Sequence, residues 1–560
     1  MSTILTLHDP ATARRHYAEG VWRDDTLYSL LQGHAARRSD AFALRDGSRR
    51  LTWRDLLAWV DAVAADLHEA GMRAGERVSV WLPNRVETLV VALACSRNGY
   101  VVNPSLHRSY GVAEITSLVD GIKSSALIAE SGFGADGATA DIFVAAQSVK
   151  SLRRVYRLDP LRAQTPVSAA PAHPFPRPTD APAPLPPTDK NPDKIVYLAF
   201  TSGTTGRPKG VMHSDNTLLA NGRAMVEDWH HDERTVLLSL SPLSHHIATV
   251  ALEQMLVAGF ELVVNDPPPG MSVLDWMIAS GATYVMGVPT HAMDILDAAR
   301  RRGLERLGAV RIFYMAGAPI PRETAQEFLD RGITPQNIYG MTENGSHQYT
   351  LPTDDAATIV ATCGRACRGY EIKIFRADDP DTEAGQGEVG EIGGRGGVLT
   401  LGYFGDQAAS ESSFNRGGWF MSGDLGRLDA KGNLEILGRK KELIIRGGHN
   451  IYPARIEDLA LRHPGIARVA AFPVADRRLG EKVCLAVVAR GGAAPAAMEV
   501  LAHLREAGLS IYDMPEFFVA LADFPLTASG KVLKRELVEM AKSGRIALEP
   551  VQWSERQKGA

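Results

Sequence analysis

Short apolar runs alternate with segments of helical periodicity along the first 350 residues of this sequence. The runs begin at Arg77, Ile195, Val236, Tyr284 and Arg311 and read RVSVWL, IVYLAF, VLLSL, YVMGV and RIFYM. Helix-period segments separate several of them, and one such segment carries an apolar stripe at Leu56, Val60, Val63 and Leu67. Parallel strands need a long crossover connection, which is usually a helix. The alternation therefore predicts an α/β fold built on parallel sheets.

The composition is that of a globular chain with several folding units. The 560 residues include 61 Lys+Arg and 65 Asp+Glu, which gives a net charge of −4. This balance lacks the positive field of a nucleic-acid binder, so no nucleic-acid partner is expected. The four cysteines give no disulfide framework, and no segment reaches the ~18 uninterrupted apolar residues of a membrane span. These features predict a cytoplasmic protein.

Two changes in pattern divide the chain. Nine prolines in residues 165–190 cannot join a helix or a sheet interior, so they predict an extended surface connection inside a large domain. From about residue 362, short strands with glycine turns predict a small β-barrel-like subdomain that ends at residue 437. A compact α+β pattern follows. We therefore predict an N-terminal domain of residues 1–437 and a C-terminal domain of residues 438–560.

The segment TSGTTGRPKG, residues 201–210, directly follows the run IVYLAF. Glycines let a backbone approach a phosphate closely, and N–H groups, hydroxyls and a lysine donate hydrogen bonds to phosphate oxygens. The spacing is not that of a Walker A loop. A flexible turn is the structural alternative. We predict a phosphate-binding loop with contacts from Thr201, Ser202, Gly203, Thr204, Thr205 and Lys209.

Four more motifs follow in order: YGMTE at 339–343, SGDLG at 422–426, GRKKELIIRGGHNIYP at 438–453 and PLTASGK at 525–531. Together with the phosphate loop, they resemble the signatures of the adenylate-forming superfamily of acyl- and aryl-CoA synthetases, peptide-synthetase adenylation domains and firefly luciferase. The resemblance extends over nearly the whole chain. It implies a large N-terminal adenylation domain of αβ subdomains, followed by a small, mobile α+β C-terminal domain. It also implies ATP, Mg²⁺ and coenzyme A as reaction partners.

The resemblance assigns roles to individual residues near the reacting groups. Lys531 would bridge the acyl carboxylate and the α-phosphate, Thr342 would contact that phosphate, and Glu343 would help to hold Mg²⁺. His245, in PLSHHIA, matches a gate beside the carboxylate. Further nucleotide contacts would come from Gly317, Ala318, Pro319, Tyr339, Gly340, Asp424 and Arg439. Lys441 matches the hinge of the C-terminal domain, and Gly447 and Gly448 belong to a loop that would approach the thiol.

Outside this context the same residues have simpler interpretations. Gly-Asp is a common turn, RKKE is a solvated charge run, and His245 could be a half-buried structural histidine. The adjacent His245 and His246 lack a third metal ligand nearby. GQGEVG at 385–390 fits a dinucleotide-binding pattern, but it opens no helix and is rejected. Arg455 departs from the pattern of many relatives, where YPARIE has glutamate in this position.

Within the superfamily, the resemblance favours a freestanding acid:CoA ligase that forms an acyl-adenylate and pyrophosphate, then an acyl-CoA and AMP. The predicted substrate is a medium-sized apolar acid, whether alicyclic, aryl or short to medium aliphatic. Pocket candidates are His246, Met286, Ala316, Gly340 and Met341. The alternatives are an adenylating enzyme that loads a carrier protein, a non-catalytic nucleotide or acyl sensor and, more remotely, an oxygenase. A homodimer is compatible with this interpretation.

Overall fold

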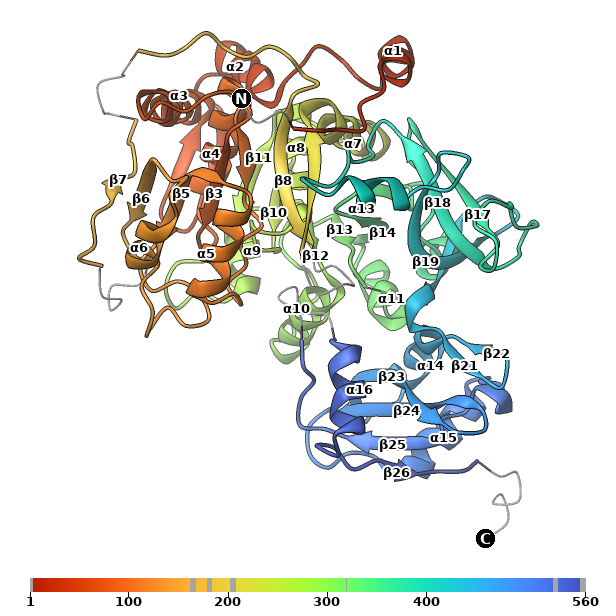
Figure 1. The fold of residues 1–560 in the computed structure, drawn as a ribbon. Helices are drawn as coiled ribbons and strands as arrows, with labels where there is room; N and C mark the ends of the chain where they lie inside the picture. Colours follow the sequence, from red (N-terminus) through yellow and green to blue (C-terminus); the bar gives the residue numbers. More distant parts are fainter. Residues whose placement is uncertain are drawn as a thin grey trace. The chain divides into compact units, whose positions relative to one another are not determined.

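The computed structural model describes residues 4–161, 168–178, 184–201, 208–318, 320–526 and 532–553. The chain divides into two compact units, Met1–Ile372 with Gly394–Phe414, and Lys373–Gly393 with Asn415–Ala560. Figure 1 shows their sheets with helices packed against them. The predicted α/β class with parallel sheets is confirmed.

A nine-stranded sheet forms part of the first unit. Its strands from β14 to β1 are parallel, with antiparallel strands added at both ends. The runs predicted as strands at Val236, Tyr284 and Arg311 occupy its centre. The order is β16 (Arg365–Ala366), β15 (Gly345–Tyr349), β14 (Thr334–Met341), β13 (Ile312–Met315), β12 (Tyr284–Gly287), β10 (Val236–Ser239), β11 (Glu261–Val264), β1 (Phe42–Arg45) and β2 (Arg50–Thr52).

A seven-stranded sheet forms the other part of this unit. All its strands are parallel except β9, which pairs antiparallel with β8. The order is β7 (His173–Pro174), β6 (Arg154–Leu158), β5 (Ser124–Glu130), β3 (Arg77–Trp81), β4 (Val101–Asn103), β8 (Ile195–Thr201) and β9 (Lys209–Ser214).

Helices of this unit form where an N-cap residue precedes an amphipathic segment, as α3 illustrates. In α3 (Trp53–Glu69), Thr52 caps the helix by accepting from the N–H of Asp55, and the predicted stripe from Leu56 to Leu67 is buried. The others are α1 (Pro10–Ala18), α2 (Leu27–Arg37), α4 (Glu87–Asn98), α5 (Val112–Gly121), α6 (Ile142–Ala145), η1 (Ala146–Ser148), α7 (Asp215–Trp229), α8 (His246–Ala258), α9 (Val273–Ala279), α10 (Pro289–Arg301), α11 (Arg322–Asp330), α12 (Ala356–Ala361) and α13 (Gln407–Ser412). None of the described helices is both long and apolar enough to cross a membrane.

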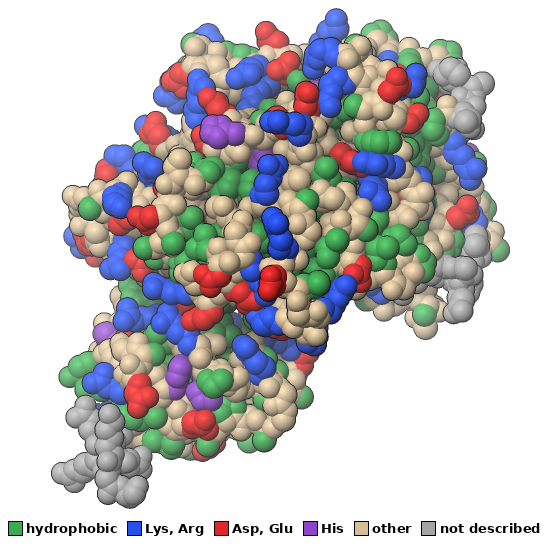
Figure 2. All heavy atoms as spheres, turned by 180° about the vertical axis from the view of Figure 1, so that it is seen from behind, with side chains coloured by type: hydrophobic (Ala, Val, Ile, Leu, Met, Phe, Trp, Pro, Cys, Tyr) green, Lys and Arg blue, Asp and Glu red, His purple; other side chains and the backbone are tan. Residues whose placement is uncertain are grey.

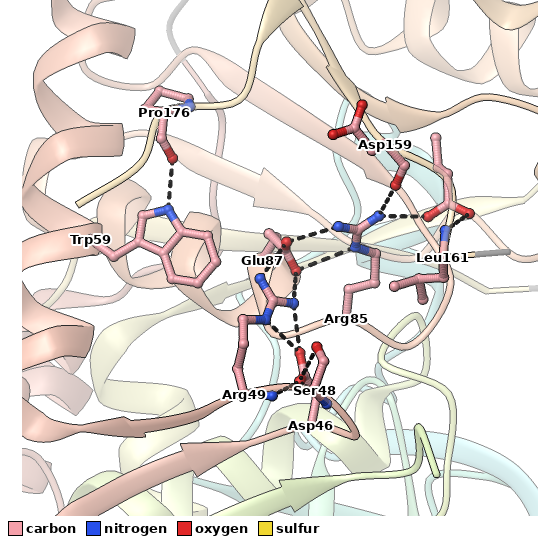
Figure 3. Close-up of polar contacts among 10 residues, drawn as sticks. Asp46, Ser48, Arg49, Trp59, Arg85, Glu87, Asp159, Leu161 and Pro176 are labelled. Carbon is pink, nitrogen blue, oxygen red and sulfur yellow. Dashed lines mark hydrogen bonds and ion pairs between the residues drawn. The ribbon is translucent and has the colours of Figure 1, made fainter. Parts of the chain in front are cut away.

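The proline-rich connection is extended where it is described, and it is also anchored. β7 adds to the edge of a sheet, where proline's missing N–H is tolerated. Pro176 is buried, and its carbonyl accepts from the indole Nε1 of Trp59 at 2.7 Å (Figure 3). The predicted surface connection therefore packs on α3 at this point.

Beside this anchor lies a cavity of about 850 Å³ whose arginines are already engaged. Arg49 donates to Asp46 and Glu87, while Arg85 donates to Glu87, Glu130 and the carbonyl of Asp159 (Figure 3). The guanidinium groups of Arg49 and Arg85 are thus paired with carboxylates, whereas that of Arg157, another lining residue, donates to the carbonyls of Ser168 and Ala170. Acidic and basic side chains are likewise interspersed on the face seen in Figure 2.

Two further sheets contain all the remaining strands of the described residues. The first has the order β17 (Tyr370–Phe375), β18 (Gly390–Gly396), β19 (Phe420–Leu428) and β20 (Leu434–Arg439), and the boundary between the units passes through β17 and β18. The second contains β21 (Ile444–Arg446), β22 (His449–Ile451), β23 (Ile466–Asp476), β24 (Gly480–Ala489), β25 (Phe517–Ala520) and β26 (Glu549–Pro550). With it go η2 (Lys440–Glu442), α14 (Pro453–Leu461), α15 (Ala497–Glu506), η3 (Ile511–Asp513) and α16 (Lys534–Lys542). The division into compact units differs from the boundary at residues 437/438, which stays a prediction.

Candidate functional site

The predicted phosphate loop connects β8 to β9. Thr201 ends β8 and pairs in register with Lys209 at the start of β9, so the two arms of the loop are fixed by a strand pair. The ammonium of Lys209 lies 4.5 Å from the ring centroid of Tyr403. This contact holds a positive charge at the base of the loop. Four of the predicted contacts, Ser202, Gly203, Thr204 and Thr205, lie outside the described residues.

The YGMTE motif begins at the end of β14 and continues into the turn towards β15. Tyr339 is 9% exposed and packs edge-on against His347, with ring centroids 5.4 Å apart. Gly340 has no room for a side chain, because a Cβ there would lie 1.8 Å from the carbonyl oxygen of Gly345. The carbonyl of Thr342 lies 2.7 Å from Nε2 of His213. The motif is thus held in a tight turn at the end of a buried strand.

Tyr403 joins this motif to the phosphate loop, and sequence reasoning missed it. Its hydroxyl donates to Oε1 of Glu343 at 3.0 Å, while its ring lies beneath Lys209. Burial and the neighbouring Glu343 raise the pKa of Tyr403, so the phenol remains a proton donor. Glu343 itself is 9% exposed. A buried carboxylate and a lysine ammonium are therefore organised around one aromatic side chain.

Four histidines gather at the start of α8. His245 is its N-cap residue, and its ring centroid lies 4.5 Å from that of His107. His246 follows, with Nδ1 at 3.3 Å from the hydroxyl of Tyr197 and its ring stacked on His213. Burial lowers the pKa of His107 and His213 to about 4. It also lowers the pKa of His246 well below 6.5, so these imidazoles are neutral at pH 7.

The predicted pocket residues lie at neighbouring strand ends. Met286 is fully buried near the end of β12 and accepts at Sδ from the amide of Gln254 at 3.4 Å. Ala316 follows β13 and donates its N–H to the carbonyl of Gly287. Gly317 has φ +88°, a conformation that favours glycine, and it begins the exposed turn that follows β13. Met341 closes β14, where its N–H donates to Asn344. Pro319 lies outside the described residues.

In the second unit the two predicted ribose contacts meet. Asp424 on β19 and Arg439 on β20 are partners in register, and Nε of Arg439 lies 3.2 Å from Oδ1 of Asp424. Asp424 is 6% exposed, and its N–H donates to the hydroxyl of Ser422. The hydroxyl of Ser422 thus caps this turn. The carboxylate keeps acceptor capacity beyond the arginine contact.

The predicted hinge and thiol-side residues also belong to this unit. Lys441 is exposed in η2, and Gly447 and Gly448 form the turn between β21 and β22 at φ +59° and +87°. Lys531 lies outside the described residues. Arg455 lies in the first turn of α14, and nothing in the structure explains its departure from the family pattern.

Lys534 is a second residue that sequence reasoning missed. It begins α16, three residues after Lys531, and forms ion pairs with Glu442 at 2.9 Å and Glu457 at 2.8 Å. Burial lowers its pKa, but the two carboxylates outweigh that effect and raise it overall. Glu442 directly follows Lys441. This pair of contacts ties the start of α16 to the predicted hinge segment.

Comparison with known proteins agrees with this arrangement. The family described as AMP-binding enzyme matches residues 31–404, and its C-terminal domain matches residues 455–531. The medium-chain fatty-acid–CoA ligase of Escherichia coli K12 is 28% identical over 95% of this chain and 93% of its own length. Salicylyl-CoA synthase / salicylate adenylyltransferase of a Streptomyces species is 31% identical over 97% and 98%. The crystal structure of ATP-bound MatB from Rhodopseudomonas palustris has a TM-score of 0.80 and 28% identity, covering 92% of this chain and 99% of that one.

A Gly/Ser/Thr-rich loop after strand β8, a buried tyrosine–glutamate turn and a paired aspartate and arginine are features of a nucleotide-binding enzyme of α/β class. The AMP-binding enzyme family matches about two thirds of the sequence, so the chain belongs to this family. The resemblance to the adenylate-forming superfamily, drawn from five motifs, is confirmed.

Proposed function

We propose that this protein is an ATP-dependent carboxylic acid:CoA ligase. Family membership along the chain carries the proposal, supported by relatives whose names specify CoA ligation of a medium-chain fatty acid and of salicylate. In the first step a carboxylate oxygen attacks the α-phosphorus of ATP and pyrophosphate leaves. In the second the CoA thiolate attacks the acyl carbon, and AMP leaves.

The chain's charged residues suit the first step, in which two anions must meet. Lys209, held over Tyr403, places positive charge at the phosphate loop. Thr342 would contact the α-phosphate, and Lys531 would bridge it to the acyl carboxylate. Asp424 would accept from the ribose hydroxyls and so fix the nucleotide, since proximity and orientation lower the barrier to attack. His245 would line the carboxylate's approach.

Glu343 fits the role of a magnesium ligand. Mg²⁺ in nucleotide sites typically takes one or two carboxylates together with phosphate and water oxygens. Glu343 offers a buried carboxylate oriented by Tyr403, and the described residues hold no group of three or more His, Cys, Asp or Glu that could bind a metal alone. When bound, the ion would neutralise phosphate charge. A single carboxylate suits an ion that binds together with ATP and takes its other ligands from phosphate and water.

The principal test is the substitution Lys531→Ala. We expect acid-dependent AMP release to fall by at least about a hundredfold, a loss typical of removing one electrostatic contact to a transition state. Thioester formation from supplied acyl-adenylate should be spared. Lys542→Ala, which removes an exposed lysine of the same unit, serves as the control. Wild-type turnover in Lys531→Ala would refute the assignment of this lysine.

A panel of aliphatic, alicyclic, aryl and hydroxy acids, assayed with ATP and CoA for AMP release, identifies the acid. The pocket candidates His246, Met286, Ala316, Gly340 and Met341 support a medium-sized and mostly apolar one. Adenylate formation without acceptance of CoA would instead favour an enzyme that loads a carrier protein. The name of one relative, which includes adenylyltransferase, supports this alternative. ATP binding without any turnover would favour a sensor. A cytoplasmic location and a homodimer stay predictions.

A further inference from the structure

One row of the nine-stranded sheet carries polar side chains inside the core. Ser239 of β10 is in register with Met286 of β12, and Met286 with Tyr314 of β13. Tyr314 is in turn in register with Gln336 of β14. Neighbours in register on parallel strands face the same side of a sheet, so these four side chains share one face. None is more than 1% exposed.

Helix α8 covers this row with two more polar residues. Gln254 donates to Sδ of Met286, and Glu253 precedes it. The hydroxyl of Tyr314 lies 2.7 Å from Oγ of Ser346, whose N–H donates to Asn221, the residue before Gly222 on helix α7. A Cβ at Gly222 of α7 would lie 2.7 Å from the Cβ of Glu253. The two helices therefore approach closely, and Glu253 is sealed at 1% exposure.

Five polar atoms of this layer have no hydrogen-bond partner among the described residues. They are both carboxyl oxygens of Glu253, Oε1 of Gln254, Nε2 of Gln336 and Oγ of Ser239. Each unpaired buried group costs about 1–3 kcal/mol, so apolar residues of similar size would make this core more stable. Burial also raises the pKa of Glu253 well above its usual value, which favours the protonated carboxyl, a group that can both donate and accept.

Members of this row coincide with or adjoin the predicted acyl-pocket residues. Tyr314 is two residues before the pocket candidate Ala316 on the same strand path, and Met286 is itself a pocket candidate. Glu253 follows the gate residue His245 by eight positions, a rise of about 12 Å along α8. An acid whose carboxylate lies beside His245 would need an acyl chain of this length to bring its far end to Glu253.

We propose that Ser239, Glu253, Gln254 and Gln336, the distal polar cluster, bind a hydroxyl or carbonyl oxygen at the far end of the acyl group. The favoured substrates are then medium-length acids with an oxygenated tail. This inference rests on the proposed acid:CoA ligase function and specifies its substrate class. A site that hydrogen-bonds a substrate hydroxyl rejects the analogue that lacks it, because its buried polar groups are left unpaired.

The test compares medium-chain acids carrying a terminal hydroxyl or oxo group with their unsubstituted parents, through kcat/KM from AMP release. The wild type should prefer the oxygenated acid, and Glu253→Leu should lower this preference at least about tenfold. The same variant should raise the Tm, because it removes unpaired polar atoms. Glu253→Gln should keep most of the preference, since an amide also donates and accepts.

Ser79→Ala is the matched control for Ser239→Ala, because Ser79 is a buried serine of the other sheet paired with Ser124 at 2.6 Å. Only Ser239→Ala should lower the preference. A raised Tm in Glu253→Leu with an unchanged preference would overturn the proposal and leave the cluster a structural feature that holds water. If the wild type turns over no acid, the ligase function fails. Calorimetry would then compare the affinities of the wild type and Glu253→Leu for oxygenated and parent acids. This comparison tests the cluster independently of turnover.

Discussion

At the scale of single residues, Tyr403 has the most consequential position in the candidate site. One face of its ring stabilises the Lys209 ammonium, and its hydroxyl orients the Glu343 carboxylate. These two charges come from motifs more than 130 residues apart in the sequence. Tyr403 lies in the plain glycine-flanked segment LGYFG, which carries no signal of such a role, so only the folded chain reveals it.

Tyr403→Phe separates the two functions of this residue. The ring that supports Lys209 remains, but Glu343 loses a hydrogen bond of the charged kind, which is worth about 1.5–3 kcal/mol. We expect adenylation to slow about tenfold or more and to require a higher Mg²⁺ concentration for half-maximal pyrophosphate exchange. Tyr349→Phe, which removes a buried hydroxyl bonded to Asp228, is the control. Wild-type magnesium dependence in Tyr403→Phe would contradict this role.

At the scale of elements, the start of α16 depends on Lys534. Its ammonium is shared by Glu442 of η2 and Glu457 of α14, so one side chain ties three helical elements together. Lys534→Met should leave two carboxylates facing each other. We expect a loss of about 1–3 kcal/mol in unfolding free energy, less than for a fully buried pair because Glu442 is partly solvated.

Chemical unfolding, followed by a signal from the second unit, measures this loss in unfolding free energy. Lys542→Met, which breaks the exposed pair with Glu539, should cost much less. Adding Glu457→Gln to Lys534→Met should recover part of the stability by removing one unpaired charge. A Lys534→Met protein as stable as its Lys542→Met counterpart would show that the two ion pairs contribute little.

At the scale of the whole molecule, buried neutral histidines make the first unit sensitive to acid. Burial lowers the pKa of His107, His213 and His231 to about 4 from 6.5. Below pH 6.5 the unfolded chain takes up protons that the folded chain does not. Stability should therefore fall as the pH drops from 6.5 towards 4, by about 1.4 kcal/mol per pH unit for each such histidine.

His231→Phe tests this dependence away from the candidate site. The ring of His231 stacks on Tyr284 with centroids 4.4 Å apart, and phenylalanine keeps that packing without the titrating group. Urea midpoints at pH 7.5 and pH 5.0 should differ less in this variant than in the wild type. An undiminished difference would place the acid sensitivity elsewhere.

The sequence was informative where chemistry is encoded in contiguous residues. The strands at Val236, Tyr284 and Arg311 follow from local apolar runs, whereas the nucleotide contacts of Asp424 and Arg439 stay predictions from their motifs. What could not be predicted depends on register between distant strands. Ser239 and Gln336 belong to one row only because β10, β12, β13 and β14 align, and the His107–His245 contact joins two unrelated loops. Periodicity within one segment carries no information about such pairings.

Residues 401–404 run beside β9, with backbone hydrogen bonds from Leu401 to Met212, from Met212 to Gly402 and from Phe404 to Gly210. During synthesis β9 is made almost two hundred residues before this partner. Until residue 404 has left the ribosome, the strand that carries Lys209 has an open edge, and open edges invite pairing with other chains. The predicted phosphate loop is therefore completed late in synthesis, and a nascent chain stopped near residue 372 would expose an unpaired strand edge that can pair with other chains.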